Sequence, residues 1–281
     1  MRNTLLRKAL ERKTENVNRL TNEGFVETVE KAKNMWIEFE PRKLPCKLIG
    51  IDSSHNSLKY QGVLLYGIDV FASDENGEKI FEDADIRTAT QKDEPSSRAA
   101  EFEIIALKNS IWKADYVLVD GSVLSHNFRD KENSDEIIDL LTSRPNIIFI
   151  SKTSYSKKQF SGNFGDMMYF NKATKKTGMT EVLKTVGTRF TSKNFTISYV
   201  FARLAMDTQL LRIEMFGDEH DEDEFRDVLD HISYKSKHGY PHVLKLAHNN
   251  CEITNKDMQV IANQYSLKHE IGSREAVSHW L

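Results

Sequence analysis

Two aspartates follow short apolar segments of the chain, and each is followed by small residues. Asp52 follows the segment 48–51, and Asp120 follows the segment 116–119. Apolar runs rich in β-branched residues are typical of buried strands. Two carboxylates at the ends of strands can bind one divalent cation, because such cations prefer hard oxygen ligands. The pair indicates metal-assisted phosphoryl chemistry, with ordinary Asp-Gly turns as the alternative.

A metal site for this chemistry needs a third acid, and the helix expected at 97–113 offers Glu101 and Glu103. On a helical wheel of about 100° per residue, Glu101 falls in the apolar arc, whereas Glu103 falls near 200°, on the face expected to be solvated. A buried carboxylate needs a partner, and a cation is the strongest one. We therefore expect Glu101 to bind the metal, with Glu103 as the second candidate. A salt bridge from Glu101 to Arg98 is the alternative.

A tyrosine and a histidine are grouped in a C-terminal segment that begins Gly-Tyr-Pro. Pro241 suits the first position of a helix, and His248 lies eight residues after Tyr240, about two turns along. Imidazole is a common ligand of Mn²⁺ or Zn²⁺. Tyr240 could donate a hydrogen bond to a phosphate or to the attacking water. Taken singly, each residue is more often structural, because a lone histidine is usually a hydrogen-bonded polar residue and a tyrosine before proline usually packs.

The segment 151–195 carries nine lysine and arginine residues against two acidic residues, and aromatic residues are interleaved with them. Basic residues mixed with aromatic ones suit a groove that follows a nucleic-acid strand. The alternative is a solvated insert. The nucleic-acid candidates in this segment are Lys152, Lys157, Lys158, Lys172, Lys175 and Lys176.

The elements that must position these residues form an ordered series. We expect helices within 3–38 with a break at 22–24, then strands at 47–52, 61–72 and 78–88. The helix at 97–113, a strand at 115–120, a helix near 133–143 and a strand at 146–151 follow. Beyond the basic segment we expect strands at 195–203 and 209–216, a helix at 221–233 and further helices that include one capped by Ser273. The order β-β-β-α-β-α-β is that of an RNase H-like mixed sheet flanked by helices.

Composition limits the class of protein. The chain has 281 residues, 39% of them hydrophobic and 29% charged, which fits a globular protein. No apolar run is long enough to span a bilayer, the start lacks the apolar stretch of a signal peptide, and two cysteines give no disulfide framework. We expect a cytoplasmic protein with an N-terminal helical arm at 1–45 and one globular domain at 46–281.

In these motifs the chain resembles the NurA nucleases of archaea and bacteria. The matching pieces occur in family order, and they are Ile51-Asp52-Ser53-Ser54, the acidic helix from Arg98 to Leu107, Leu118-Val119-Asp120-Gly121-Ser122, Ile150-Ser151-Lys152-Thr153-Ser154 and the segment from Gly239 to His248. They cover nearly the whole chain from 47 to 260. The family's first motif is more often Asp-Gly-Ser, so Ser53 replaces the usual glycine while the carboxylate is kept.

The resemblance implies an RNase H-like fold, a homodimer and a Mn²⁺-dependent nuclease, with Mg²⁺ as another possible cofactor. Its implied activities are single-strand endonuclease and 5′→3′ exonuclease on DNA, in partnership with a HerA-type hexameric helicase in DNA-end resection. By residue, it implies that Asp52, Glu101 and Asp120 bind the metal. His248 would be a metal ligand or a general acid–base, Tyr240 an active-site phenol, and Lys152 a cation that neutralises the scissile phosphate.

Two other functions remain open from the sequence. The first is a non-catalytic DNA-binding scaffold subunit that keeps the fold without the chemistry; the intact set of acidic residues and histidine argues against it. The second is a metal-dependent phosphatase or NTPase. The sequence carries neither a P-loop nor an Asp-x-Asp phosphatase signature at a strand end, so this alternative ranks lower.

Overall fold

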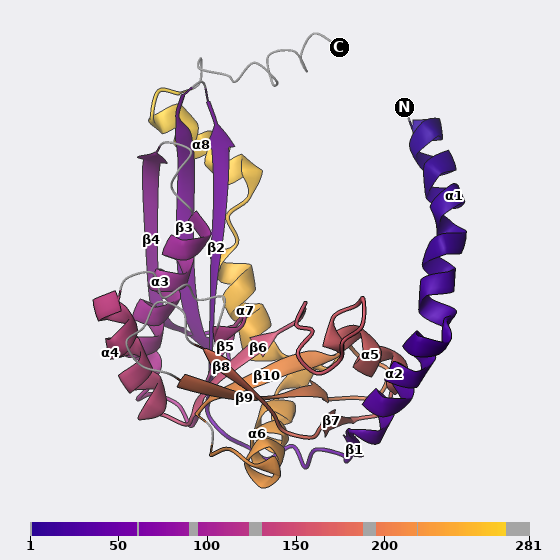
Figure 1. The fold of residues 1–281 in the computed structure, drawn as a ribbon. Coiled ribbons are helices and arrows are strands. Elements are labelled where there is room, and N and C mark those ends of the chain that lie inside the picture. Colours follow the sequence, from indigo (N-terminus) through magenta and orange to yellow (C-terminus); the bar gives the residue numbers. More distant parts are fainter. Residues whose placement is uncertain are drawn as a thin grey trace.

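The fold is organised around one large mixed sheet (Figure 1), seen in a computed structural model that describes residues 2–60, 62–89, 95–123, 131–187, 195–217 and 219–267. In this part of the chain ten strands follow the order β1-β7-β9-β10-β6-β5-β2-β3-β4, with β8 beside β9. The strands β2, β5 and β6 run parallel, and the other pairs are antiparallel. The bounds are β1 (Trp36–Glu38), β2 (Leu48–Lys59), β3 (Leu64–Asp74), β4 (Lys79–Ala89), β5 (Tyr116–Asp120), β6 (Ile147–Ser151), β7 (Gly178–Thr180), β8 (Leu183–Gly187), β9 (Phe195–Arg203) and β10 (Leu211–Phe216).

Helices cover both faces of this sheet. Two pack on one face, α3 (Pro95–Ser110) and α4 (Lys131–Thr142), and two on the other, α6 (Glu222–Tyr234) and α7 (His242–Cys251). The remaining helices are α1 (Arg2–Thr21), α2 (Glu23–Asn34), α5 (Asp166–Ala173) and α8 (Asn255–Gln264), and a short ribbon joins β11 (Ser236–Lys237) to β12 (Tyr240–Pro241). The predicted fold class, a mixed sheet flanked by helices, is confirmed.

Alternation along the strands decides which side chains meet which helices. In β2, Ile49 and Ile51 point toward the core under α3 and α4. The intervening positions point the other way, toward α7, because successive side chains of a strand alternate between the faces. The residue at position 50 is glycine, and a Cβ there would lie 2.3 Å from Val243 on α7. This glycine therefore lets α7 pack directly on β2.

The first strand of the predicted core is longer than expected. The sequence analysis ended it at residue 52, but β2 continues to Lys59 as the antiparallel partner of β3. Its parallel neighbour β5 ends at Asp120, so residues beyond Asp52 have a strand partner on one side only. Polar residues such as Ser53, Ser54 and Asn56 hid this extension, because they interrupt the apolar pattern that signals a strand.

The N-terminal arm has the predicted break. The side chain of Asn22 caps α2 by accepting a hydrogen bond from the backbone N–H of Phe25. While α2 packs against α5, α1 extends away from the sheet and exposes Leu5, Leu6 and Leu10. Residues 36–38 then add β1 to the edge of the sheet beside β7. Within the described residues, no helix has the length and apolar character needed to cross a membrane.

The basic segment is folded, and its structure was not foreseen. It contains α5 and two strands, β7 and β8, that both pair with β9 and so extend the sheet. Two aromatic residues of this segment, Tyr169 and Phe170, are buried in the core beside α2, so their rings are not available to a nucleic acid. The helix predicted after Ser273 lies outside the described residues.

Substitution of Gly50 by alanine tests the contact between β2 and α7. The added methyl group would overlap both the side chain and the backbone of Val243, so we expect the free energy of unfolding to fall by about 1–3 kcal/mol. The matched control is Gly24→Ala in α2, where the added methyl group would lie 3.9 Å from its nearest neighbour and no loss is expected. Urea denaturation of both variants measures the difference; equal stabilities would contradict the close approach.

Candidate active site

The sheet brings the two aspartates of the sequence analysis side by side. In the parallel pairing of β2 with β5, Ile51 is opposite Val119, so Asp52 and Asp120 are the next residues on neighbouring strands. Both follow buried apolar residues and share the face covered by α7. Alternation thus directs the two carboxylates to the same face, at the point where β5 ends and the sheet opens.

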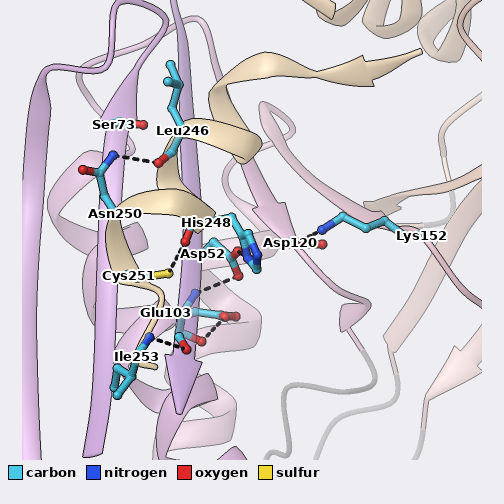
Figure 2. Close-up of polar contacts among 12 residues, drawn as sticks. Asp52, Ser73, Glu103, Asp120, Lys152, Leu246, His248, Asn250, Cys251 and Ile253 are labelled. Carbon is cyan, nitrogen blue, oxygen red and sulfur yellow. Dashed lines mark hydrogen bonds and ion pairs between the residues drawn. The ribbon is translucent and has the colours of Figure 1, made fainter. Parts of the chain in front are cut away.

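Asp52 is the most buried acid of this group, with 6% of its surface exposed. Its Oδ2 lies 2.8 Å from Nδ1 of His248 on α7, and Figure 2 shows the two side chains pointing toward one another. Burial raises the pKa of Asp52 to about 7. The charges of Asp120 and Glu103 add to this shift, and the hydrogen bond and charge of His248 oppose it. Asp52 therefore sits in a cluster whose negative charges are only partly compensated.

The third acid of the cluster is Glu103, and the helical-wheel prediction for α3 is wrong. Glu103 is buried and accepts a hydrogen bond from the hydroxyl of Ser53. Glu101 is exposed and forms an ion pair with Arg98, the alternative noted from the sequence. The buried face of α3 is formed by Ala99, Phe102, Glu103, Ile104, Ala106, Leu107 and Ser110. The wheel set its apolar arc without the buried alanines and Phe102.

Asp120 is paired with a lysine from the next strand. Nζ of Lys152, the residue after β6, lies 2.7 Å from Oδ2 of Asp120. The same ammonium group lies 4.8 Å from the centre of the Tyr240 ring, a cation–π contact. Tyr240 is itself buried. Burial, and then the charges of Asp120 and Asp52, raise the pKa of its phenol, so the hydroxyl stays protonated and is available as a donor.

The cluster fits a divalent cation by its chemistry. Each of its three carboxylates is engaged by a side chain of the protein, and within the described residues no three acidic, histidine or cysteine side chains converge closely enough to hold a metal as they stand. The donor set of carboxylates and an imidazole nevertheless suits Mn²⁺ or Mg²⁺. Burial, and then the charges of Asp120 and Glu103, raise the pKa of Asp52, and a cation would stabilise its charged form against both. A bound cation would compete with Lys152 for the carboxylate of Asp120.

The pKa of Asp52 predicts how the stability of the metal-free protein depends on pH. The pKa of Asp52 is about 7 in the folded state and near 3.8 in the unfolded state, so the folded state holds the proton of Asp52 more tightly. The stabilisation of the fold by this proton is complete at low pH and is lost as the pH rises through 7. We expect the loss to be about 2–3 kcal/mol between pH 5 and pH 8. Asp52→Asn should remove it.

Urea denaturation in EDTA at both pH values tests this expectation. Asp69, whose pKa is raised to about 6 by burial and by the charges of Glu82 and Asp83, titrates in the same range. The difference between the wild type and Asp52→Asn therefore isolates Asp52. If that difference is the same at pH 5 and pH 8, the account of the cluster is contradicted.

A second polar network beside the cluster was missed from the sequence. Glu214 on β10 is fully buried, forms an ion pair of 2.6 Å with Nε of Arg212, and accepts hydrogen bonds from the Ser122 hydroxyl and the Val123 backbone N–H. This network fixes the turn that follows Asp120. The signal in the sequence is the alternation of charged and apolar residues within 211–216, which places Arg212 and Glu214 on one face of a strand.

The structure divides the lysines proposed to bind nucleic acid into two groups. Lys152, Lys157 and Lys158 follow β6 and lie near the carboxylates or beside Ser122. Lys176 forms an ion pair with Glu38 on β1, and Lys175 donates to Asn171 of α5. This second group, with Lys172, belongs to the edge of the sheet formed by β1 and β7, several strands from β5. A role of that edge in binding DNA stays a prediction.

Comparison with known proteins gives the following likenesses. The NurA domain family matches residues 46–253. The crystal structure of the NurA nuclease from Sulfolobus solfataricus matches with a TM-score of 0.75 and 21% identity, over 94% of this chain and 96% of that chain. A NurA structure with manganese has a TM-score of 0.60 at 11% identity, over 93% and 97% of the two chains. One bound to dAMP and manganese has a TM-score of 0.55 at 9% identity, over 91% and 94%. No curated protein matched the sequence.

Proposed function

The chain belongs to the NurA family of metal-dependent nucleases, and from this premise we propose that it is a Mn²⁺-dependent DNA nuclease. The observation that carries the proposal is the buried cluster at the end of β5. There Asp52, Asp120 and Glu103 gather beside His248, and their mutual repulsion contributes to raising the pKa of Asp52. Mn²⁺ is the first candidate for the cofactor, and Mg²⁺ is the second.

We assign the metal to the three carboxylates, with His248 as a further ligand or as a general acid–base. The bound cation would supply an acidified water as the nucleophile and would neutralise charge on the phosphate. Glu103 takes the place that the sequence analysis gave to Glu101, because only Glu103 is buried in the cluster.

The groups around the carboxylates have distinct roles in the proposed hydrolysis. When Lys152 leaves Asp120, its ammonium group is free to pair with a non-bridging phosphate oxygen or with the leaving 3′-oxygen. Tyr240 keeps its proton and can donate a hydrogen bond to the phosphate or to the attacking water. His248 can hold Asp52 in position or move a proton, because its ring nitrogen already contacts that carboxylate.

We propose single-stranded DNA and DNA ends as the substrate, cut by single-strand endonuclease and 5′→3′ exonuclease activity in DNA-end resection. A NurA structure bound to dAMP and manganese supports a deoxynucleotide as the kind of ligand. The basic residues after β6 support a polyanionic substrate near the carboxylates.

For partners, we propose a homodimer that works with a HerA-type hexameric helicase. The feature that supports association is α1, which extends away from the sheet and exposes three leucines, Leu5, Leu6 and Leu10. Exposed apolar side chains on one helix are typical of surfaces that contact another protein. Light scattering of the purified protein, alone and with the helicase, measures both associations.

End-labelled single- and double-stranded DNA, incubated with Mn²⁺, Mg²⁺ or EDTA, tests the proposed activity. We expect cleavage with Mn²⁺ and none with EDTA. Binding of single-stranded DNA without cleavage in either metal would support the scaffold alternative instead. Release of phosphate from mononucleotides while oligonucleotides stay intact would support a phosphatase.

A further inference from the structure

A separate cavity of about 440 Å³ opens beside the cluster, at the carboxyl ends of β5 and β6. We call it the hydroxyl pocket; its lining includes Ser122, Ser151, Ser156, Lys157, Lys158 and Arg212. Ser122 lies two residues after Asp120, and Ser151 directly precedes Lys152. The pocket therefore adjoins the proposed metal centre, yet none of the carboxylates of that centre lines it.

The inner wall of the hydroxyl pocket offers hydrogen-bond donors that the protein itself does not use. Ser151 is only 6% exposed, and its hydroxyl has no hydrogen-bond partner among the described residues. A buried hydroxyl without a partner is costly, which indicates a ligand or water at this position. Arg212, which is opposite Ser151 in the pairing of β10 with β6, is equally buried. Its Nε pairs with Glu214 and its Nη1 donates to the hydroxyl of Ser154, so its guanidinium is held in place.

The outer wall carries positive charge on an ordered loop. Nζ of Lys157 donates to the carbonyl of Asn163, and the ammonium of Lys158 contacts Thr185 on β8. Among the described residues, neither lysine has a carboxylate within ion-pair distance. The buried carboxylate of Asp166 fixes the loop by accepting backbone N–H groups of residues 158–160. The two ammonium groups are therefore carried by a loop whose backbone is held in place by hydrogen bonds.

An aromatic ring stands at the rim of the hydroxyl pocket. Tyr155 is 90% exposed, and it lines the cavity together with its neighbours Ser154 and Ser156. A tyrosine exposed to this extent contributes nothing to the core. Exposed aromatic rings next to basic residues are the usual platform on which bases of single-stranded nucleic acids stack.

We propose that the hydroxyl pocket binds one nucleotide of a DNA single strand, the one next to the nucleotide held at the carboxylates. Its phosphate would be bound by Ser151, Arg212 and the two lysines, and its base would stack on Tyr155. This proposal rests on the proposed nuclease function, because it makes the pocket a subsite of the same substrate. It adds a strand-positioning surface to the metal centre and predicts that affinity depends on bases as well as on phosphates.

Binding in EDTA tests the subsite without requiring catalysis. Fluorescence anisotropy measures the affinity of a labelled dT12 strand and of an abasic strand of equal length. Tyr155→Ala should weaken dT12 binding about tenfold and leave abasic binding unchanged, and Tyr155→Phe should bind dT12 like the wild type. Lys157→Ala with Lys158→Ala should weaken both ligands and reduce the slope of log K against log salt by about 1.4, or about 0.7 per lysine.

Matched controls are Trp112→Ala, an exposed aromatic residue, and Lys113→Ala, both before the amino end of β5 and so away from the carboxyl ends of the strands. An unchanged dT12 affinity in Tyr155→Ala, or an unchanged salt slope in the lysine variant, would overturn the subsite. Cleavage with Mn²⁺ is measured on the same preparations. If the variants show these binding effects but the wild type does not cut DNA, the proposed nuclease activity is refuted and the subsite is retained. If the wild type cuts DNA but the variants bind normally, the subsite is refuted and the nuclease activity is retained.

Discussion

Replacing Glu103 by glutamine is expected to slow Mn²⁺-dependent cleavage about a thousandfold, whereas Glu101→Gln on the same helix should leave the rate unchanged. Metal-bound charge stabilisation amounts to several kcal/mol in the transition state, and each 1.36 kcal/mol is a factor of ten in rate. Glu103 is buried beside Ser53 and contributes to the raised pKa of Asp52. Glu101 is exposed and paired with Arg98. Because the two glutamates lie two residues apart on the same helix, Glu101→Gln is a matched control for Glu103→Gln.

Single-turnover cleavage of labelled single-stranded DNA measures both rates, with thermal unfolding as the check that each variant is folded. Glutamine keeps the size of Glu103 and can still accept a hydrogen bond from Ser53, so the fold should be retained. A large loss in Glu101→Gln with normal activity in Glu103→Gln would contradict the placement of the third carboxylate and would restore the assignment made from the sequence.

Asp120→Asn is expected to cause a loss of similar size, and Lys152→Met a smaller one. Within the described part of the chain, Asp120 is the only acid of the cluster that pairs with a lysine. Its Oδ2 lies 2.7 Å from Nζ of Lys152. Removing the carboxylate removes a proposed ligand, at a cost of about a thousandfold in rate. Removing the ammonium leaves the ligand in place and deletes one electrostatic contact to the phosphate, for which about a hundredfold is expected.

The variants Asp120→Asn and Lys152→Met are compared by their cleavage rates and by how these rates depend on the Mn²⁺ concentration. Asp120→Asn should require more Mn²⁺ for half-maximal cleavage. Lys152→Met should require the same amount or less, because the ammonium competes with the cation for Asp120. Equal rate losses with unchanged Mn²⁺ dependence in both variants would indicate that the ion pair matters only for structure.

Much of the fold could be predicted because its strands are apolar and its turns are distinct. Strand β6 is buried throughout and β5 is buried except at its two ends, and their apolar runs marked both within one residue. The capping box of Thr254 and Asp257, which is a sequence signal for a helix start, likewise begins α8. The second half of β2 and the short β7 and β8 were missed, because partly exposed or very short strands do not have a continuous apolar pattern.

The site was predictable where it depends on strand ends and unpredictable where it depends on tertiary packing. Asp52 and Asp120 could be picked out because an acid that directly follows an apolar run is a local pattern in the sequence. The choice between Glu101 and Glu103 depends on which face of α3 meets the sheet, and the wheel lacked the alanines that define that face. The pairing of Glu214 with Ser122 joins residues 92 positions apart, which no local pattern could indicate.

The central claim is that the carboxylate cluster of this chain binds a divalent cation, and titration of the protein with Mn²⁺ followed by electron paramagnetic resonance tests it most directly. Free Mn²⁺ gives a sharp signal that disappears on binding, so the measurement needs neither DNA nor turnover. We predict that the wild type depletes the free signal with saturable stoichiometry, that Glu101→Gln does the same, and that Asp120→Asn and Glu103→Gln do so much more weakly. Equal depletion by the wild type and all three variants would contradict the account.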